Sequence, residues 1–281
     1  MYVSYYPGCC MHGTAKGYGQ SLQAVSQALD LELLEVKDWT CCGASSAHAT
    51  DFELSVALPA RNLLAAQKSG YDVMVPCAAC FNRFKAAEHH LARDPALKNR
   101  IEESIQGRIQ STVAVRNAVD YFVNEVGLEA IRSKMTRKLT GLKPVSYYGC
   151  LLTRPPEVCE FDDAENPVSM DHLMDALGAE ARPWSFKTDC CGGNLSLSKT
   201  DQVVRLVDRL VDMAREAGAN CLVTACPECM SNLDMRATRG MPIFYFSELM
   251  GLALGASGAD KWFRFHHIDP VPLLRQVGIF L

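Results

Sequence analysis

The sequence predicts an α/β protein of two pseudo-symmetric, Rossmann-like lobes, each with a small parallel sheet and a site at the carboxyl ends of its strands. Three observations support this fold class. The cysteine pattern of the first half recurs in the second half. Short apolar runs rich in β-formers alternate with segments of helical periodicity, as in strands joined by helices. Glycine or cysteine follows the apolar runs, where such strands end and the chain turns.

The repeat begins with two short strands. The segment from Val3 to Cys9 reads VSYYPGC, and the segment from Val145 to Cys150 reads VSYYGC. Four identical residues thus precede a Gly-Cys in both halves, with one extra proline in the first. Both segments are rich in β-formers and end at glycine, which is typical of buried strands. We therefore expect equivalent strands in which the two VSYY runs align.

Each half then continues with a helix, a glycine and a second strand. Gly70 and Gly218 follow the predicted helices at the position where a left-handed cap is favoured. An apolar strand follows and runs directly into a Cys-x-x-Cys. The predicted helices span about residues 20–29, 55–68 and 202–217, and these strands span residues 73–75 and 222–224.

The repeat divides the chain into two predicted domains, residues 1–143 and residues 144–281. Within the first, residues 81–140 are charged and helix-favouring, and we expect them to form a connector between the lobes. Within the second, the Gly/Ala-rich stretch from residue 251 to residue 258 is expected to be a flexible joint. A C-terminal tail, residues 263–281, would follow it.

Ten of the thirteen cysteines fall into two matching sets of five. The Cys-Cys-Gly and Cys-x-x-Cys groups of the two halves are separated by 149 positions, but the first cysteines of each set by only 141. The second half therefore has eight extra residues between its first cysteine and its double cysteine. Pro155 to Pro167 is acidic and rich in turn-formers, so we expect the extra residues there.

Composition narrows the class of protein. The 281 residues carry 28 basic and 32 acidic side chains, a net charge of −4, so nothing favours nucleic acid or an anionic membrane as partner. No run of eighteen apolar residues predicts a membrane span, and the first ten residues lack the pattern of a secretory signal. We expect a cytoplasmic protein. Regularly spaced cysteines in that compartment favour a metal site or redox catalysis over structural disulfides.

Each cysteine group is predicted at the end of a strand, where the sites of parallel α/β sheets form. Cys-x-x-Cys places two sulfurs on one side of a tight turn. Adjacent cysteines need a sharp turn to serve one site, and Gly43 and the Gly192-Gly193 pair permit it. Zinc and cubane clusters take four protein ligands. A fifth cysteine therefore indicates either a more open cluster with a bridging thiolate or a redox-active thiol beside a four-ligand site.

The two motifs resemble the cysteine-rich CCG domains of the B-type subunit of heterodisulfide reductase and its bacterial relatives, over nearly the whole chain. The segment from Cys226 to Asp234 and the Tyr-Pro-Gly-Cys9 start also resemble that family. The 34 residues between double cysteine and Cys-x-x-Cys are at or just below the family's interval. The resemblance implies a non-cubane [4Fe-4S] cluster in each domain, held by all five cysteines of each set. These are Cys9, Cys41, Cys42, Cys77 and Cys80 in the first domain and Cys150, Cys190, Cys191, Cys226 and Cys229 in the second.

The resemblance also implies an oxidoreductase subunit that cleaves or forms disulfide or sulfane-sulfur bonds in a crevice between the clusters. The sequence contains no G-x-G-x-x-G after a strand and no flavin signature, so electrons must pass to or from another subunit. By resemblance the partners are a ferredoxin-like iron–sulfur subunit of the C type and a flavin-bearing subunit of the A type. The substrate would be a small thiol, a disulfide or a sulfur carrier.

Two other functions stay open: an electron-transfer subunit whose clusters never touch substrate, and a structural protein with zinc at one or both sites. His48 could donate a proton to a departing thiolate, although a capping role is the alternative, and His12 is a similar candidate. Arg83 and Lys85 could attract an anion or balance cluster charge, or be ordinary surface residues. We expect the remaining cysteines to be packed side chains or incidental thiols, with Cys10 the first candidate for another role because it is next to Cys9, and the His266-His267 pair to be solvated or packed. The remaining cysteines are Cys10, Cys159 and Cys221.

Overall fold

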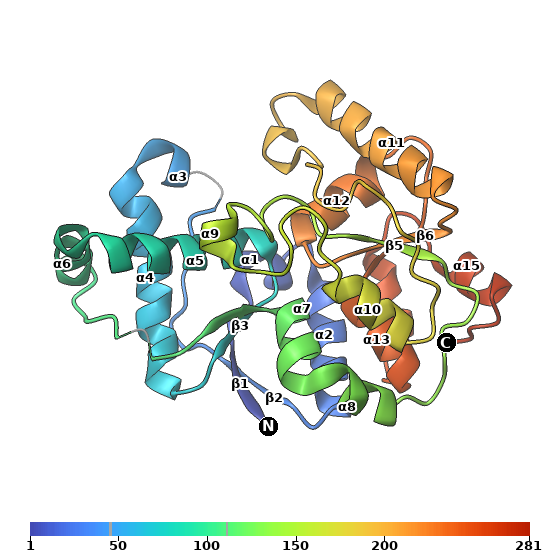
Figure 1. Cartoon of the computed structure of the whole chain (residues 1–281), viewed down its shortest axis with the longest axis horizontal. Coiled ribbons are helices and arrows are strands. Elements are labelled where there is room, and N and C mark those ends of the chain that lie inside the picture. The colour runs from blue at the N-terminus through green and yellow to red at the C-terminus, as the bar shows by residue number, and fades with distance from the viewer. Residues whose placement is uncertain (45–46, 111) are drawn as a thin grey trace.

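The computed structural model describes residues 1–44, 47–110 and 112–281. It contains two small sheets with the strand orders β2-β1-β3-β4 and β5-β6-β7 (Figure 1). Every described strand pair is parallel, which confirms the predicted fold class. The strands are β1 Tyr2–Tyr5, β2 Glu32–Glu35, β3 Val73–Val75, β4 Val115–Asn117, β5 Pro144–Tyr147, β6 Cys221–Thr224 and β7 Ile243–Tyr245.

Helices connect and cover the strands. Gly70 and Gly218 have φ angles of 72° and 77°, so both adopt the left-handed conformation that the sequence predicts. The helices of the first half are α1 Gly8–His12, α2 Lys16–Ala28, α3 Ala47–Thr50, α4 Phe52–Ala66, α5 Ala78–Arg93, α6 Pro95–Ser104, α7 Ala118–Asp120 and α8 Leu128–Ser133. Those of the second are α9 Pro156–Cys159, α10 Ser169–Ala176, α11 Thr200–Glu216, α12 Pro227–Arg236, α13 Phe246–Leu254, α14 Ala259–Trp262 and α15 Val271–Gln276. Short 3-10 turns are η1 Gln67–Ser69, η3 Gly193–Leu195 and η4 Phe263–Phe265, and η2 Tyr121–Gly127 is a π-helix.

The sheet register shows that the expected alignment of the two VSYY runs is wrong by one residue. Ser4 lies opposite Val73 in the first sheet, and Val145 lies opposite Leu222 in the second. Val73 and Leu222 are equivalent because each precedes its Cys-x-x-Cys by the same number of residues. Ser4 therefore corresponds to Val145, and the first half has no inserted proline.

In the corrected alignment Tyr6-x-Gly-Cys corresponds to Tyr147-x-Gly-Cys. The hydrogen bonds of the two tyrosines agree with this. The Tyr6 hydroxyl donates to the carbonyl of Thr40 at 2.7 Å, and the Tyr147 hydroxyl donates to the carbonyl of Asp189 at 2.6 Å. Thr40 and Asp189 each directly precede a double cysteine, so the same tyrosine ties the first strand to the cysteine turn in both lobes.

Three strands were not expected from the sequence. Among them, β4 lies within residues 81–140, so the expected connector also supplies an edge strand to the first sheet. The equivalent strand β7 completes the second sheet. The second lobe has no described counterpart of β2, although its chain follows β5 there: Glu180 and Arg182 donate backbone hydrogen bonds to the carbonyls of Leu142 and Pro144.

Helices of each lobe pack on helices of the other lobe. In the first lobe α2 follows the first strand, and it packs on α13, which follows the last strand of the second lobe. Tyr18 stacks on Tyr245 with ring centroids 4.1 Å apart, and Ser21 and Ser247 share a hydrogen bond of 2.6 Å. The equivalent α10 packs on α7 and α8 of the first lobe. These helices lie together in the middle of the molecule, as a pseudo-two-fold relation requires (Figure 1).

The extra residues of the second half also bind the lobes together. Helix α9 packs on α5 of the first lobe. The Asn82 amide donates to the carbonyls of Leu151 and Arg154 at 3.2 and 2.8 Å, and Lys85 pairs with Glu160 at 3.1 Å. The acidic, turn-rich segment is therefore an interface element as well as a loop.

The expectation of a flexible joint at residues 251–258 is wrong. Helix α13 continues to Leu254, and Gly251 lies inside it against Trp262 of α14. A Cβ atom at Gly251 would lie 2.6 Å from the Trp262 ring. Small residues here serve close packing between helices, and the tail after them continues with α14, η4 and α15.

A pair of glycine variants measures this packing. Gly251→Ala is expected to destabilise the protein by about 1–3 kcal/mol, because the added methyl overlaps Trp262. Gly19→Ala in α2 is the matched control: its Cβ would meet Met11 at an ordinary 3.5 Å, so helix propensity should stabilise it by about 0.5–1 kcal/mol. Thermal unfolding of both variants tests this. If both variants changed the thermal stability by the same amount in the same direction, the packing assigned to Gly251 would be contradicted.

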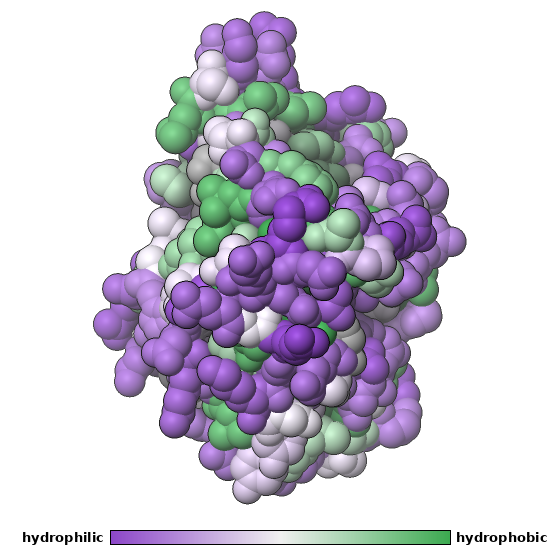
Figure 2. Space-filling model, turned by 90° about the vertical axis from the view of Figure 1, so that its left-hand side faces the viewer, coloured by the Kyte–Doolittle hydropathy of each residue, from purple (hydrophilic) through white to green (hydrophobic). Residues whose placement is uncertain are grey.

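Polar and charged side chains cover most of the face that Figure 2 shows, with apolar side chains gathered towards its upper half. Several large apolar side chains are exposed, and Leu197 in the loop after η3 is 97% exposed. None of the described helices combines the length and the hydropathy needed to cross a membrane.

Candidate functional site: two cysteine centres

The first cysteine centre lies at the carboxyl ends of β1, β2 and β3, as the strand order predicts. The sulfurs of Cys42 and Cys80 are 3.0 Å apart, and the amide of Gly43 donates to the Cys41 sulfur at 3.4 Å. Cys9 and Cys41 are exposed, whereas the other three are buried. The members of the centre are Cys9, Cys41, Cys42, Cys77 and Cys80.

The second centre repeats this arrangement. The sulfurs of Cys191 and Cys229 are 3.6 Å apart, those of Cys150 and Cys190 are 3.8 Å apart, and the amide of Gly192 donates to Cys190 at 3.3 Å. All five cysteines line one cavity of about 270 Å³, with Leu195, Leu206 and Tyr148 among its walls. The predicted second set is thus brought together around a single space.

A glycine in the left-handed conformation backs each centre. Gly8 and Gly149 have φ angles of 64° and 69°. A Cβ atom would lie 3.2 Å from the Cys80 sulfur at Gly8 and 2.9 Å from the Cys229 sulfur at Gly149. Any side chain would both strain the backbone and displace the cysteine, so this position requires glycine in both lobes.

Thiolates are favoured at equivalent positions of the two centres. A hydrogen bond with Cys80 lowers the pKa of Cys42, and a hydrogen bond with Cys229 lowers the pKa of Cys191. A hydrogen bond with Cys150 lowers the pKa of Cys190 to about 6. The thiolate is the form of cysteine that binds metal.

Cys10 is the exception among the unrepeated cysteines. Its thiol is hydrogen-bonded to Cys77 and Cys9, and these bonds together with burial raise the pKa of Cys10. The same bond from Cys10 holds the pKa of Cys77 well below its usual value. The first centre therefore has a sixth sulfur beside it, where the second has Leu151.

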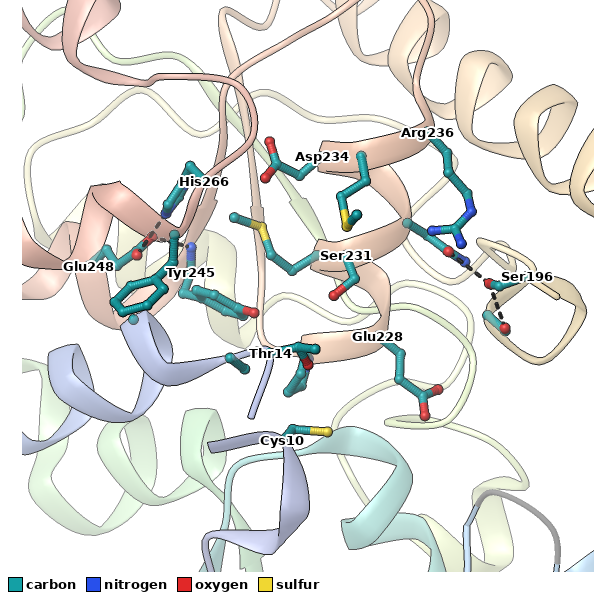
Figure 3. Close-up of a pocket in the computed structure, with 18 of the residues that line it drawn as sticks. Cys10, Thr14, Ser196, Glu228, Ser231, Asp234, Arg236, Tyr245, Glu248 and His266 are labelled. Carbon is teal, nitrogen blue, oxygen red and sulfur yellow. Dashed lines mark hydrogen bonds and ion pairs between the residues drawn. The ribbon is translucent and has the colours of Figure 1, made fainter. Parts of the chain in front are cut away.

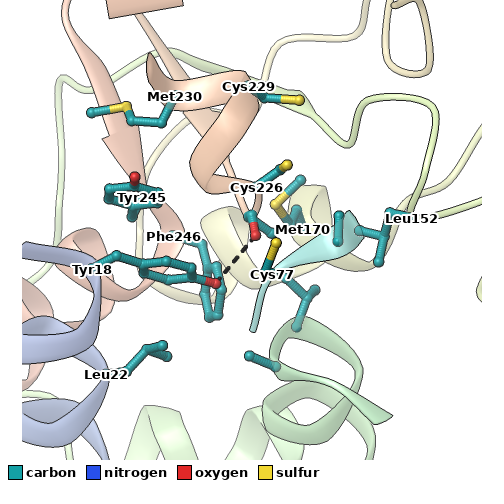
Figure 4. Packing of buried hydrophobic residues seen from close by; sticks show 14 of the residues in the cluster. Tyr18, Leu22, Cys77, Leu152, Met170, Cys226, Cys229, Met230, Tyr245 and Phe246 are labelled. Carbon is teal, nitrogen blue, oxygen red and sulfur yellow. Dashed lines mark hydrogen bonds between the residues drawn. The ribbon is translucent and has the colours of Figure 1, made fainter. Parts of the chain in front are cut away.

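The two centres approach each other at the lobe interface. Cys77 and Cys226 both point into the buried region between the lobes (Figure 4). A hydrogen bond from Cys229 lowers the pKa of Cys226, but burial and the nearby charge of Cys77 raise it more. The Tyr18 hydroxyl donates to the carbonyl of Ala225 at 3.3 Å, which fixes this junction from the first lobe.

A larger cavity of about 510 Å³ opens beside the two centres. Cys10 lines it from the first lobe, and Glu228 and Gly193 line both this cavity and the smaller one. Helix α12 forms one wall, and α13 and the C-terminal segment form the opposite one (Figure 3).

The donor set favours an iron–sulfur group over a lone metal ion. Among the described residues, no three His, Cys, Asp or Glu side chains are spaced to hold a single ion. The five thiols of the second centre instead line one shared space without a histidine, and Gly149 lies directly behind the Cys229 sulfur. Cysteine thiolates around a shared space are the ligands that iron–sulfur clusters take.

None of the histidines singled out in the sequence lines the smaller cavity around the second centre. His48 is exposed on α3 and lines neither of the two cavities described above. His12 stacks on Trp39 with ring centroids 5.6 Å apart and lies 3.7 Å from Glu35. His267 is exposed, but His266 lines the larger cavity and is paired with Glu248.

The two basic candidates and the remaining unrepeated cysteines each have a different environment. Burial lowers the pKa of Arg83, and the negative charge of Cys42 opposes this, so Arg83 lies near the first centre. The ammonium group of Lys85 forms ion pairs with the carboxylates of Glu88 and Glu160. Cys221 is buried in β6, and Cys159 receives a hydrogen bond from Asn82 at 3.3 Å, so both are packed residues as expected.

Sequence reasoning missed the side chains that α12 contributes to the larger cavity. Glu228, Ser231 and Met235 recur at helical spacing and lie on one face of α12. The proline of Cys-Pro-Glu-Cys at the first helical position could have indicated this helix, because proline favours that position.

Comparison with known proteins gives consistent matches. The family model described as "CCG: Cysteine-rich domain" matches residues 3–85 and 145–234. The chain is 28% identical to the 8-methylmenaquinol:fumarate reductase membrane anchor subunit of Wolinella succinogenes, over 96% of this chain and 98% of that protein. It is 26% identical to the B-type subunit of the ferredoxin/F420H2-dependent CoB-CoM heterodisulfide reductase of Methanosarcina acetivorans, over 98% and 96% of the two chains.

Among solved structures, a hypothetical protein from Helicobacter pylori superposes with a TM-score of 0.73 at 10% identity. The match covers 95% of this chain and 52% of that one, so this chain spans about half of it. At 10% identity this match shows that the two proteins share a fold and nothing more.

Proposed function

Because the chain belongs to the cysteine-rich CCG domain family and carries two copies of the domain, we propose that it is the iron–sulfur subunit of a heterodisulfide reductase-like complex. Each cysteine centre would hold one [4Fe-4S] cluster through five cysteines, in a non-cubane form. A cluster bound there supplies one-electron transfer at the edge of the larger cavity. The observation that carries this proposal is the pair of matching five-cysteine centres that meet at Cys77 and Cys226.

The chain's own residues would hold each cluster, fix the cysteine turns in place and supply apolar surroundings. The glycines at positions 8 and 149 leave room for the converging sulfurs, and the amides of Gly43 and Gly192 donate to Cys41 and Cys190. Tyr6 and Tyr147 fix the double-cysteine turns. Leu151, Leu195 and Leu206 give the second centre apolar walls, which strengthen electrostatic interactions near them.

The reaction would take place in the larger cavity. Two electrons and two protons convert one disulfide into two thiols, and the reverse reaction releases them. The electrons would pass through a ferredoxin-like iron–sulfur subunit and a flavin-bearing subunit, with the complex in the cytoplasm. Homologues named as the B-type subunit of a heterodisulfide reductase, or as a protein like it, support this assignment with 25–27% identity over most of the chain.

A second candidate function rests on the Wolinella relative, which is named as a subunit of a quinol:fumarate reductase. In that case the two centres would pass electrons between a quinol and a partner reductase without contacting a disulfide. Reduction by a menaquinol analogue, with no spectroscopic response to thiols, would favour this candidate.

The test is anaerobic purification followed by iron and sulfide analysis and EPR with and without a thiol. We expect about eight iron atoms per chain and an EPR signal that changes when thiol is added to the oxidised protein. Fewer than about four irons after reconstitution, or stoichiometric zinc in a colourless protein, would count against two clusters.

Gly149→Ala tests the space behind the second centre. The added methyl would lie 2.9 Å from the Cys229 sulfur, so we expect about half of the iron to be lost. Gly127→Ala is the control, because its φ of 86° imposes similar strain while no atom lies within 4 Å. Iron analysis of both variants should show a loss only for Gly149→Ala. Equal losses would assign the effect to backbone strain.

A further inference from the structure

Tyr245 brings a hydroxyl without an acceptor to the larger cavity. It is the last residue of β7 and directly precedes α13, and it is 5% exposed. Figure 3 shows its ring in the cavity wall, reaching towards the space between α12 and the segment that carries Cys10 and Thr14. Its hydroxyl donates no hydrogen bond to any residue that the structure describes. Because a buried tyrosine hydroxyl normally has an acceptor, we expect a molecule that enters the cavity to supply one.

Four other buried tyrosines around the two centres use their hydroxyls inside the protein. They are Tyr6, Tyr18, Tyr147 and Tyr148. Three of them donate to backbone carbonyls and the fourth donates to a carboxylate, over distances of 2.6–3.3 Å. Each of these bonds ties one segment of the fold to another, which accounts for the hydroxyl. The hydroxyl of Tyr245 ties no segments together, so a phenylalanine would fill its place in the wall equally well.

The ring of Tyr245 is held in one orientation. Tyr18 stacks on it with ring centroids 4.1 Å apart and the two planes within 2° of parallel. Tyr18 is itself fixed, because its hydroxyl donates to the carbonyl of Ala225 at 3.3 Å. The backbone amide of Tyr245 donates to the carboxylate of Glu248 at 2.9 Å. The direction of the free hydroxyl is therefore set before a ligand arrives, as is required of a donor that stabilises charge during a reaction.

The hydroxyl of Tyr245 lies near a cysteine of each lobe. Cys10, beside the first centre, lines the same cavity. Burial raises the pKa of Tyr245 well above its usual value, and negative charge on Cys226 and Cys10 is among the smaller causes. The hydroxyl thus keeps its proton at physiological pH and can donate a hydrogen bond. A disulfide that is cleaved here leaves negative charge on sulfur, and a thiolate sulfur can only accept.

We propose that Tyr245 is a catalytic residue whose hydroxyl donates a hydrogen bond to the sulfur that becomes negatively charged when a disulfide is cleaved in the larger cavity. The inference deepens the proposed function, on which it rests, by assigning a side chain of this chain to the reacting sulfur. Tyr245 transfers no proton in this role, so the reaction still takes up two electrons and two protons for each disulfide. The hydroxyl stabilises the thiolate until that sulfur is protonated.

The experiment compares the wild type with Tyr245→Phe, which keeps the stacked ring and removes only the hydroxyl. Oxidised, anaerobically purified holoprotein is titrated with 2-mercaptoethanol while the thiol-induced EPR signal is followed. We expect Tyr245→Phe to need at least about tenfold more thiol for half of the signal, because the thiolate loses a hydrogen bond. In D2O the wild-type signal should show coupling to an exchangeable deuteron that the Tyr245→Phe signal lacks. Iron content and unfolding temperature should stay those of the wild type.

Tyr121→Phe is the matched control. Tyr121 is 4% exposed, its hydroxyl also donates to no residue that the structure describes, and it lies outside the cavity. This variant should titrate like the wild type. If Tyr245→Phe kept both the wild-type midpoint and the deuteron coupling, the inference would be overturned and the proposed function would stand. If the EPR spectrum of the wild type did not respond to thiol at all, the proposed function would be contradicted and the inference with it.

Discussion

A Cys191→Ala variant is expected to retain about half of the wild-type iron, and Cys42→Ala should do the same. These two cysteines occupy equivalent places, each paired with the last cysteine of its own Cys-x-x-Cys at 3.6 and 3.0 Å. Because each contributes to only one centre, the double variant should retain little iron. The iron content is measured after anaerobic purification, and EPR identifies which signal disappears.

Cys221→Ala is the control for these variants. Cys221 is as buried as the paired cysteines, but it lies in β6 and contacts neither centre. Its variant should keep all of the iron and the thiol response. If Cys221→Ala lost as much iron as Cys191→Ala, the loss would reflect general destabilisation. If neither Cys42→Ala nor Cys191→Ala lost iron, the two centres would not be cluster sites.

His266→Ala is expected to destabilise the fold by about 3–5 kcal/mol, because it leaves the buried carboxylate of Glu248 without its partner. The side chains of His266 and Glu248 are 1% and 0% exposed, and their Nε2 and Oε1 atoms are 2.9 Å apart. His267→Ala is the matched control: that side chain is exposed, and its backbone amide still binds Asp234. Thermal unfolding of the three proteins should show a large loss only for His266→Ala.

The pair of His266 and Glu248 also predicts that the stability of the fold depends on pH. Burial lowers the pKa of His266, but the carboxylates of Glu248 and Asp234 outweigh burial and raise it above its usual value of about 6.5. A group whose pKa is raised on folding contributes stability that is complete below its unfolded pKa. This contribution is lost as the pH rises through the folded value. The stability difference between wild type and His266→Ala should therefore shrink above about pH 6.5. A difference that grows with pH would contradict the pair.

The cysteine spacing was enough to predict both centres, because parallel strands bring their carboxyl ends to one edge of a sheet. Gly70 and Gly218 were predictable for a similar local reason, since a helix end needs a left-handed residue there. The alignment of the two VSYY runs failed because strand register depends on pairing with β3 and β6. Sequence identity at Ser4 and Ser146 carries no information about that pairing.

The remaining differences also depend on tertiary contacts. Gly251 reads as a joint in the sequence, but it is a packing position because Trp262 returns to lie against it. β4 and β7 have three residues each, too few to show a strand period, and unlike β3 they run into no Cys-x-x-Cys that would mark their ends. Tyr245 could be placed in the cavity only once the end of β7 was known to lie beside it, since no motif points to it.

The packing of α2 on α13 has a consequence for biosynthesis. Leu22 and Val25 of α2 are buried, and this helix packs on residues 246–254, near the far end of the chain. A ribosome must therefore release most of the polypeptide before the first lobe can cover these side chains. A nascent chain stopped after residue 143 would expose them and invite aggregation or a chaperone. Completion of the first lobe is thus expected to follow the end of translation.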